Sequence, residues 1–254
     1  MRLKTAFIIG RGEVGTRLGG ALETAGIEVR YVTRHEGWAD AVAADTEIPR
    51  LLCMREEDFT DALSQLAAVP ASSLVSVQNG WVKPLLREPE SITRGLIWFT
   101  SKGDFFRSLR PSPVHGPLAK ALVEALSVGG LDVTAVESKQ RFSQLEADKM
   151  GFNCVVGLPL AVHGITLGEY LEARTDEARA VFEEAAGICA QALGVEAEPS
   201  WWSSFVASCE PLGWVATSKA KALEFRNRAV VELAASMGRN APANQALLSA
   251  VESG

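Results

Sequence analysis

Near its N-terminus the chain reads Thr5-Ala6-Phe7-Ile8-Ile9-Gly10-Arg11-Gly12-Glu13-Val14-Gly15, and this stretch decides the fold. A short apolar run leads into three glycines spaced Gly-x-Gly-x-x-Gly. Gly10 allows a tight turn after a strand, Gly12 lets the backbone approach a pyrophosphate, and Gly15 lets the next helix pack closely on the sheet. The positive end of that helix suits phosphate. The stretch therefore predicts a dinucleotide-binding turn formed by Gly10, Arg11, Gly12, Glu13, Val14 and Gly15.

The segments that follow the turn support this prediction. Apolar residues recur with helical period from Val14 to Ala25, and a second strand is expected at residues 27–33. That strand ends in Thr33-Arg34-His35, where NAD-binding proteins usually carry an acidic residue for the ribose 2′-hydroxyl. A cation there suits a 2′-phosphate, so we predict NADPH as the cofactor, with Arg34 on the 2′-phosphate. The alternative is that Arg34 is an ordinary solvated charge.

Strand and helix signals alternate along the first half of the chain, which predicts a parallel sheet. Further strands are expected at residues 50–54, 73–77, 95–99 and 131–136, helices at 58–67 and 118–127, and a loop at 101–113. From Ser138 onward nearly every segment has helical period. The fold class we expect is therefore an α/β Rossmann-type doubly wound parallel sheet in residues 1–137, followed by an all-helical C-terminal domain in residues 138–254.

Composition excludes several function classes. The 254 residues are 47% hydrophobic and 22% charged, a globular balance, and the net charge of −6 argues against nucleic acid as a partner. The apolar runs are far shorter than the roughly 20 residues that a membrane span needs, and the N-terminus has no signal-peptide pattern. Cysteines and histidines show no metal-ligand spacing. We expect a cytoplasmic enzyme without a metal site and without a membrane partner.

Three polar residues are candidates for chemistry. Asn79 directly follows the strand expected at 73–77, and ligands in such folds bind at the carboxyl ends of strands. The alternative is that Asn79-Gly80 simply makes a tight turn. Lys149 and Asn153 are four residues apart and share one helix face. If that face lines a cleft between the domains, Lys149 would protonate an alkoxide as hydride reaches a carbonyl carbon; the alternative is a surface lysine.

Taken together, these residues resemble the ketopantoate reductase (2-dehydropantoate 2-reductase) family of NADPH-dependent reductases, across both expected domains. The shared motifs are Gly10-x-Gly12-x-x-Gly15, Arg34, Gln78-Asn79-Gly80, Lys149-x-x-x-Asn153 and Gly238-x-x-x-Pro242-x-Asn244. The resemblance implies that Lys149 is the proton donor, that Asn79 contacts nicotinamide and substrate, and that Asn153 binds substrate. It also implies a small 2-oxo acid as the substrate, with ketopantoate as the first hypothesis.

Several positions depart from the family's pattern. Gly157 stands where a second asparagine is usual, Ala147 where a tryptophan is usual, and Arg55 where a lysine is usual in the cofactor cleft. Ala222 occupies the place of the active-site glutamate. Glu224 follows two residues later and is our candidate for that catalytic carboxylate. The cofactor half of the pattern is therefore kept better than the substrate half.

Two other functions stay open. A reductase of the same family acting on another carbonyl or an imine is favoured by the missing asparagine and the displaced glutamate. An NADPH-binding sensor without turnover is the second, and the Lys149–Asn153 pair argues against it, because a pure binder has no evident use for that pair. The aromatic residues Trp201-Trp202, Phe205 and Trp214 are expected in the core of the helical domain; a homodimer interface or a substrate lid is the alternative.

Overall fold

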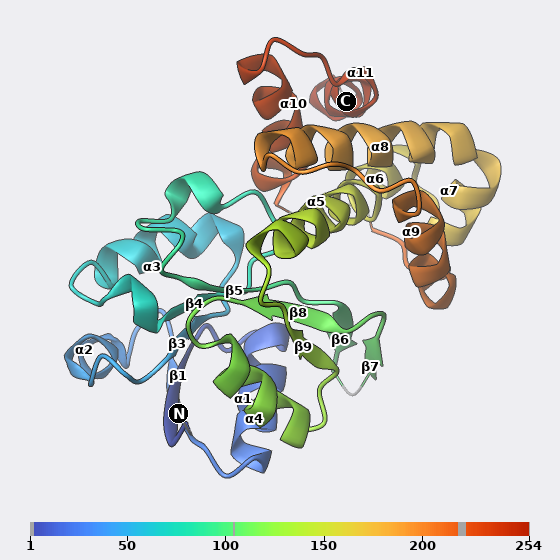
Figure 1. Cartoon of the computed structure of the whole chain (residues 1–254). Helices are drawn as coiled ribbons and strands as arrows, with labels where there is room; N and C mark the ends of the chain where they lie inside the picture. The colour runs from blue at the N-terminus through green and yellow to red at the C-terminus, as the bar shows by residue number, and fades with distance from the viewer. Residues whose placement is uncertain (1–2, 104, 218–221, 254) are drawn as a thin grey trace. The chain divides into compact units, whose positions relative to one another are not determined.

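The computed structural model describes residues 3–103, 105–217 and 222–253. It divides into two compact units, Met1–Gln78 with Val82–Phe142 and Asn79–Trp81 with Ser143–Gly254, which we call the first and second units. Figure 1 shows the course of the chain through both. The sequence-based division at residue 137 makes each domain one continuous segment, whereas these units interleave at residues 79–81.

The first unit contains a seven-stranded sheet in the order β2-β1-β3-β4-β5-β8-β9. Its strands are β1 (Thr5–Ile9), β2 (Glu28–Val32), β3 (Arg50–Leu52), β4 (Leu74–Ser76), β5 (Thr93–Gly95), β8 (Ser112–His115) and β9 (Val133–Ala135). All neighbouring strands are parallel except β5 and β8, which pair antiparallel. The prediction of a Rossmann-type, mostly parallel sheet is confirmed. The strand that follows β1 in sequence, β2, lies on one side of β1, and the next strand, β3, lies on the other side. The strand order therefore reverses between β1 and β3.

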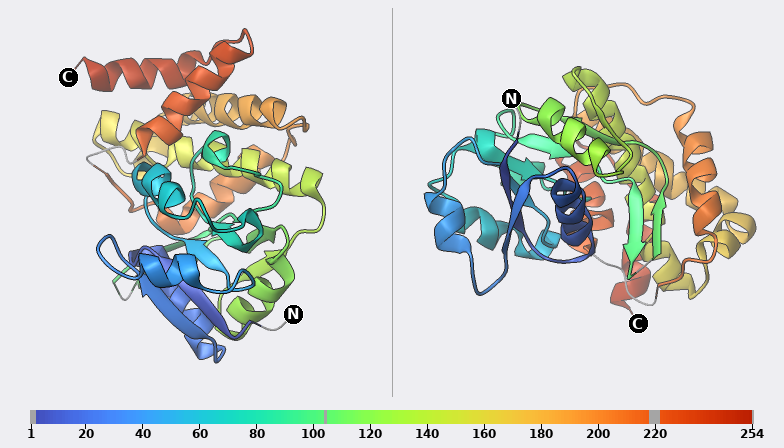
Figure 2. Two further views of the ribbon diagram at one scale, coloured as in Figure 1. Left: turned by 90° about the vertical axis from the view of Figure 1, so that its left-hand side faces the viewer. Right: turned by 90° about the horizontal axis from the view of Figure 1, so that it is seen from below.

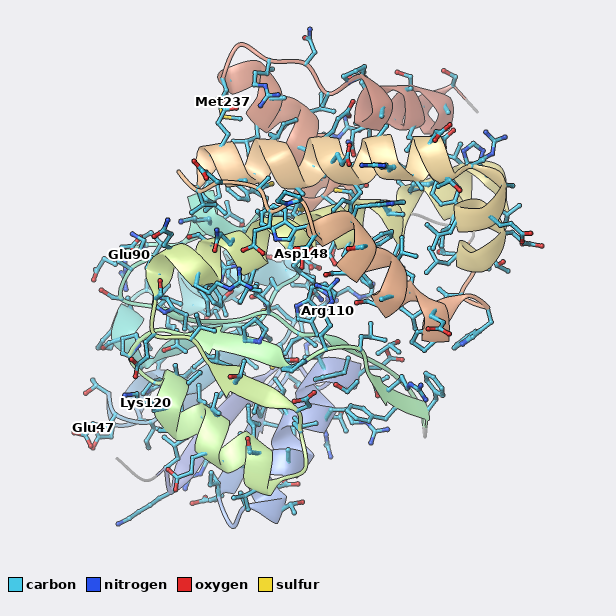
Figure 3. All side chains as sticks on the ribbon, turned by 45° about the vertical axis from the view of Figure 1, so that its right-hand side comes forward. Glu47, Glu90, Arg110, Lys120, Asp148 and Met237 are labelled. Atoms are coloured by element: carbon cyan, nitrogen blue, oxygen red, sulfur yellow. The ribbon has the colours of Figure 1, made fainter. Side chains whose placement is uncertain are left out.

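Helices cover both faces of this sheet, as Figures 1 and 2 show. They are α1 (Glu13–Thr24) and α4 (Ala119–Val128) on one face, and α2 (Trp38–Ala43) and α3 (Phe59–Gln65) on the other. Ala6 and Ile8 of β1 belong to one apolar cluster with Leu22 of α1 and Leu122 of α4. Since side chains alternate along a strand, Phe7 faces the opposite side. On the first face, Lys120 of α4 lies outward in an ion pair with Glu137 of 2.7 Å (Figure 3).

A buried arginine holds α2 against the sheet. Arg50 of β3 is fully buried, and its guanidinium donates to main-chain oxygens of residues just after and within α2: Ala41, Ala44, Asp45 and Ile48. Burial lowers the pKa of Arg50. These bonds satisfy carbonyls that a short helix leaves unpaired at its C-terminal end.

The loop expected at residues 101–113 was wrong. This stretch contains β6 (Phe99–Lys102) and β7 (Phe105–Ser108), which form a two-stranded antiparallel sheet, and then the start of β8. The rings of Phe99 and Phe106 lie 5.3 Å apart, and Arg17 of α1 donates to Ser101 Oγ and to Gly103 O. Tertiary contacts therefore hold a polar stretch in strand conformation. For the same reason, the strand expected at 95–99 is divided between β5 and β6.

In its described residues the second unit is all-helical, as expected. Its helices are α5 (Lys139–Val155, whose first turn belongs to the first unit), α6 (Leu158–His163), α7 (Leu167–Ala173), α8 (Thr175–Ala192), α9 (Trp201–Cys209), α10 (Asn227–Ser236) and α11 (Pro242–Glu252). Short 3-10 helices complete the chain: η1 (Glu56–Asp58), η2 (Ala71–Ser73), η3 (Lys83–Leu85), η4 (Glu210–Leu212) and η5 (Leu223–Phe225). Phe205 is fully buried and stacks on Trp202 at 5.2 Å, whereas Trp214, also expected in the core, is 60% exposed.

Over the described part of the chain, no single helix has the length and apolar character needed to cross a membrane. One pair of helical segments, Lys139–His163 and Leu167–Ala173, meets the requirement jointly but is bent by 87°.

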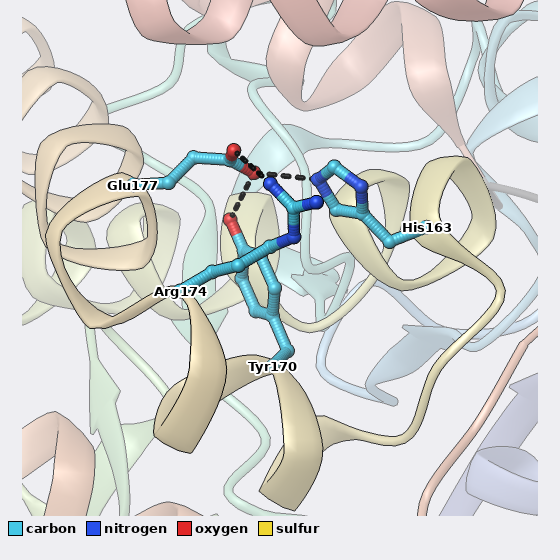
Figure 4. Close-up of polar contacts among 4 residues, drawn as sticks. All are labelled: His163, Tyr170, Arg174 and Glu177. Carbon is cyan, nitrogen blue, oxygen red and sulfur yellow. Dashed lines mark hydrogen bonds and ion pairs between the residues drawn. The ribbon is translucent and has the colours of Figure 1, made fainter.

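A polar cluster joins α6, α7 and α8 (Figure 4). Glu177 of α8 accepts hydrogen bonds from His163 Nε2 at 2.7 Å and from the hydroxyl of Tyr170 at 3.0 Å, and forms an ion pair with Arg174 at 3.3 Å. Burial raises the pKa of Glu177, but the hydrogen bonds from His163 and Tyr170 and the attraction of His163 and Arg174 outweigh it, so the pKa lies below its usual 4.5. The carboxylate form is therefore the one that the fold stabilises.

Glu177→Gln is expected to lower Tm at pH 7 by about 3–6 °C, because hydrogen bonds to a charged group are lost. A carboxyl group whose pKa is lowered on folding stabilises the folded state fully at pH values above its unfolded pKa of 4.5. It loses this contribution as the pH falls through its pKa in the folded state. The difference in Tm from wild type should therefore shrink below pH 4.5. Thermal scans between pH 3 and 8 test this, with Glu183→Gln, at an exposed i,i+4 pair with Arg179, as the control. A difference that persists unchanged to pH 3 would contradict the assignment.

Candidate functional site

A cavity of about 1020 Å³ opens in the first unit at the carboxyl ends of β1, β2 and β3. It lies where the strand order reverses, the position at which open α/β sheets bind ligands. Its lining includes the glycine turn, the residues after β2 and β3, and the start of α3: Ile9, Gly10, Arg11, Gly12, Val32, Thr33, Arg34, Trp38, Cys53, Met54, Arg55, Glu57, Asp58, Asp61, Ala62, Ser64 and Gln65. Four of the predicted cofactor residues, Gly10, Arg11, Gly12 and Arg34, therefore line one cavity.

The three glycines of the turn have different surroundings. Gly10 has a φ of +98°, which favours glycine, and a methyl group on Gly15 would lie 2.0 Å from Gly10 O. A methyl group on Gly12 would meet no protein atom within 4 Å. Gly10 and Gly15 are therefore required by the fold, whereas Gly12 borders open space at the start of α1, where Glu13 and Val14 form the first turn. Bare backbone beside open space at a helix N-terminus fits a pyrophosphate.

Three arginines line the cavity, from the glycine turn and from the residues after β2 and β3. Arg11 Cζ lies 4.7 Å from the ring centroid of Tyr31. Arg34 forms an ion pair of 3.1 Å with Asp58, and its side chain is 76% exposed. Since an exposed ion pair contributes only about 0–1 kcal/mol, Arg34 exchanges Asp58 for a phosphate at little cost. Arg55 also lines the cavity, in the segment between β3 and η1.

The other predicted site residues lie together in the second unit. Lys149 and Asn153 of α5 are 6% and 5% exposed, so the surface-lysine alternative is wrong. Lys149 Nζ lies 4.3 Å from the ring centroid of Phe152, and Asn153 Nδ2 donates to Asn79 O. The structure thus brings the Asn79 segment to the helix that carries Lys149. A buried lysine that shares a helix face with an asparagine has the composition of a proton-donating site for a polar substrate.

Glu224 has a different setting. It lies in η5, its side chain is 63% exposed, and it forms an ion pair of 2.8 Å with Arg228 Nε. Ala222, at the start of η5, is 6% exposed with a φ of +49°. A catalytic role for Glu224 requires that its ion pair with Arg228 open.

The next two residues of this segment were not singled out from the sequence. Asn227 is buried, and its Nδ2 donates to Cys154 O of α5 at 3.1 Å and to Asn244 Oδ1 at 2.9 Å. It therefore explains why Asn244 belongs to a shared motif: the pair fastens α10 and α11 to α5. Arg226 precedes Asn227 and points its guanidinium toward Gly157. The sequence offered no signal for either residue, because the burial of Asn227 is set by the packing of α10.

Among the residues that the structure describes, no group of three or more His, Cys, Asp or Glu side chains is arranged to hold a metal ion.

No protein-family model matches the sequence, and no curated protein sequence matches it significantly. Solved structures match over nearly the whole chain. A PanE/ApbA family ketopantoate reductase from Ralstonia eutropha JMP134 has a TM-score of 0.79 at 19% identity, covering 98% of this chain and 97% of its own. A dimeric ketopantoate reductase from Staphylococcus aureus has a TM-score of 0.77 at 13% identity, with 98% of each chain covered. D-mandelate dehydrogenase in complex with NADH has a TM-score of 0.75 at 18% identity, covering 99% and 98%. The chain therefore has the fold of these reductases, which confirms the resemblance at the level of fold.

Two glycine substitutions should separate cofactor binding from folding. Gly12→Val places a side chain in open space, so we expect an unchanged Tm and a loss of dinucleotide affinity of about tenfold or more, because the backbone no longer approaches the pyrophosphate. Gly15→Ala should instead lower stability by about 1–3 kcal/mol through overpacking against Gly10 O. Fluorescence titration with NADPH and NADH, together with thermal unfolding, measures both. Unchanged affinity in Gly12→Val would remove the turn from the cofactor site.

Proposed function

We propose that this protein is an NADPH-dependent reductase that converts a 2-oxo acid to a 2-hydroxy acid. The observation that carries the proposal is the buried Lys149 on α5, one turn from an asparagine that is hydrogen-bonded to the Asn79 segment. Lysine is rarely buried, and the asparagine one turn away on the same helix face suits a carbonyl or hydroxyl substrate. The likeness in fold to ketopantoate reductases and to D-mandelate dehydrogenase supports the same reaction class.

The residues of the first unit fit a nicotinamide dinucleotide. Gly10, Gly12 and Gly15 would hold the pyrophosphate at the N-terminus of α1, with Arg11, Glu13 and Val14 in the same turn. Arg34, assisted by Arg55 across the cavity, would bind a 2′-phosphate, which favours NADPH over NADH. D-mandelate dehydrogenase of the same fold was solved with NADH, so the choice between the two cofactors depends on these arginines.

In the proposed reaction the bound cofactor supplies a hydride to the carbonyl carbon. Lys149 donates a proton to the carbonyl oxygen as negative charge develops there, and returns to the ammonium form from solvent after product release. Asn79 and Asn153 orient the substrate by hydrogen bonds, with Asn79 also next to the nicotinamide. Glu224 is a further candidate for binding the substrate, once released from Arg228.

Ketopantoate is the first substrate to test, and another 2-oxo acid is the second candidate. Gly157 and Ala222 replace polar residues usual in ketopantoate reductases, so fewer groups are present to recognise the hydroxyl of ketopantoate. With fewer contacts to that hydroxyl, a 2-oxo acid that carries an apolar side chain is the second candidate, a description that also suits the substrate class of the mandelate enzyme. We further propose a homodimer, as in the Staphylococcus aureus enzyme.

Lys149→Met should lower kcat by about 10²- to 10⁴-fold, because the variant keeps the apolar stem and loses only the proton donor. The Kd for NADPH should stay within about twofold, since a general acid acts in the transition state rather than in cofactor binding. Steady-state NADPH oxidation with ketopantoate, phenylglyoxylate and pyruvate measures the rates. Lys139→Met is the matched control, because Lys139 begins the same helix and is 61% exposed in an ion pair with Glu90. A wild-type protein that binds NADPH but reduces none of these acids would favour the sensor function or an imine substrate.

Arg34→Ser should weaken NADPH binding by about 10- to 100-fold and leave NADH binding unchanged, because only NADPH carries the 2′-phosphate that the guanidinium would bind. Stability should not change, since Arg34 makes only an exposed ion pair with Asp58. Arg30→Ser on β2, also an exposed ion-paired arginine, is the control. Equal losses for NADH and NADPH would place Arg34 elsewhere than on the 2′-phosphate.

A further inference from the structure

Arg226 lies between two fixed points of the second unit. The residue before it, Phe225, accepts a hydrogen bond of 2.7 Å at its main-chain oxygen from the main-chain N–H of Trp81. The residue after it, Asn227, donates to Cys154 O of α5. Arg226 is therefore positioned between the Asn79–Trp81 segment and α5, the two segments that carry Asn79, Lys149 and Asn153.

The guanidinium of Arg226 reaches the turn that follows Asn153. A methyl group on Gly157 would lie 3.8 Å from Arg226 Nη1 and 3.5 Å from the main-chain oxygen of Asn153. Glycine at this position leaves room beside the guanidinium, and residue 157 is one helical turn after Asn153 in sequence. The side chain is thus close to the C-terminal end of α5, one helical turn beyond Asn153.

Arg226 also lacks an internal acceptor in the part of the chain that the structure describes. Its Nε is buried without a hydrogen-bond partner. Arg228 Nε also lacks a well-aligned hydrogen bond, but it lies 2.8 Å from Glu224 Oε2 in an ion pair, and Arg228 Nη2 pairs with Glu252. A buried N–H of a guanidinium without an acceptor is costly, which indicates that an anionic ligand completes the site.

Arg226 lies near enough to α5 to act on its electrostatics. Burial raises the pKa of Cys154 to about 12, and the positive charge of Arg226 acts against this rise. Together with Lys149, this gives the surroundings of Asn153 two cations. Such a setting favours a carboxylate over a neutral substrate.

We propose that Arg226 binds the carboxylate of the substrate and sets the specificity of this protein for 2-oxo acids, in the space that Gly157 leaves open. The inference rests on the proposed function and deepens it. Arginine presents parallel N–H donors to a carboxylate, so it supplies stronger anion recognition than an asparagine at residue 157 would. Specificity then depends on the negative charge of the substrate carboxylate, rather than on the asparagine that is usual at the position of Gly157.

The test uses the full chain with Arg226→Gln and Arg226→Lys, and with Arg179→Gln as the control, because Arg179 of α8 is an exposed, ion-paired arginine of the same unit. KM and kcat are measured for a 2-oxo acid and for its neutral methyl ester. Oxamate, a carboxylate that does not turn over, is titrated by calorimetry in the presence of NADP+. The Kd for NADPH and the Tm of each variant report on folding.

For Arg226→Gln we expect KM for the acid and Kd for oxamate to rise on the order of 100-fold, from the loss of a charge-assisted bidentate contact. KM for the ester should be unaffected, and kcat should change little. In Arg226→Lys, KM for the acid and Kd for oxamate should rise about tenfold, because lysine keeps the charge but not the paired N–H donors of the guanidinium. Equal losses for acid and ester would show a structural role and overturn the proposal, as would oxamate binding that is unchanged in both variants.

Failure of the proposed function is distinguishable from failure of this inference. In one outcome, the wild type reduces no 2-oxo acid but binds oxamate, and this binding is lost in Arg226→Gln and kept in Arg179→Gln. The assignment of Arg226 as an anion-binding residue is then supported, and the protein catalyses a reaction other than the proposed reduction. If the wild type turns over 2-oxo acids and Arg226→Gln does so with the same KM, the reductase stands and the assignment of Arg226 is overturned. A wild type that neither reduces 2-oxo acids nor binds oxamate overturns both.

Discussion

The proposed chemistry depends on one constraint, the attachment of the main chain of Asn79–Trp81 to the helical segments of the second unit. Trp81 N–H donates to Phe225 O at 2.7 Å, and Asn79 O accepts from Asn153. Between them, Gly80 has no room for a side chain, since a methyl group there would lie 2.5 Å from Phe225 Cβ. Three segments distant in sequence therefore meet, two through their backbones and α5 through the side chain of Asn153, so the positions of Asn79, Asn153 and the residues after Phe225 are set jointly. Backbone contacts of this kind tolerate little displacement.

Local pattern was sufficient for most of the fold. The glycine turn, the apolar period of α1 and the strand signals up to β4 depend on neighbours in sequence, and they were placed correctly to within a few residues. The β6–β7 pair was missed because residues 101–113 are rich in charged, serine and proline residues, and the pair makes contacts with α1 that no local pattern records. Arg50 shows the same limit: a strand position usually occupied by an apolar residue holds a guanidinium, whose acceptors are four carbonyls reached only after α2 has folded.

The candidate site divides in the same way. Lys149 and Asn153 were found because helical spacing alone places them on one face. The exposure of Glu224 and the burial of Asn227 were not accessible, since each depends on which face of η5 and α10 packs against α5. Arg226 could be identified only from its surroundings: Gly157 beside its guanidinium, and two flanking residues bound to different segments. A residue such as Arg226, whose role depends on the space beside a glycine distant in sequence, cannot be recognised from the sequence alone.

The character of α5 has a consequence for engineering. This helix buries four polar side chains, Ser143, Asp148, Lys149 and Asn153, in positions where apolar residues would pack with less loss of hydration (Figure 3 labels Asp148). A search for thermostable variants would therefore favour apolar replacements along α5, and such replacements at Lys149 and Asn153 would remove the groups that we propose to act on the substrate. Stabilisation of this protein is better sought on the outer faces of α8 and α11, where the helix surface has no part in the chemistry.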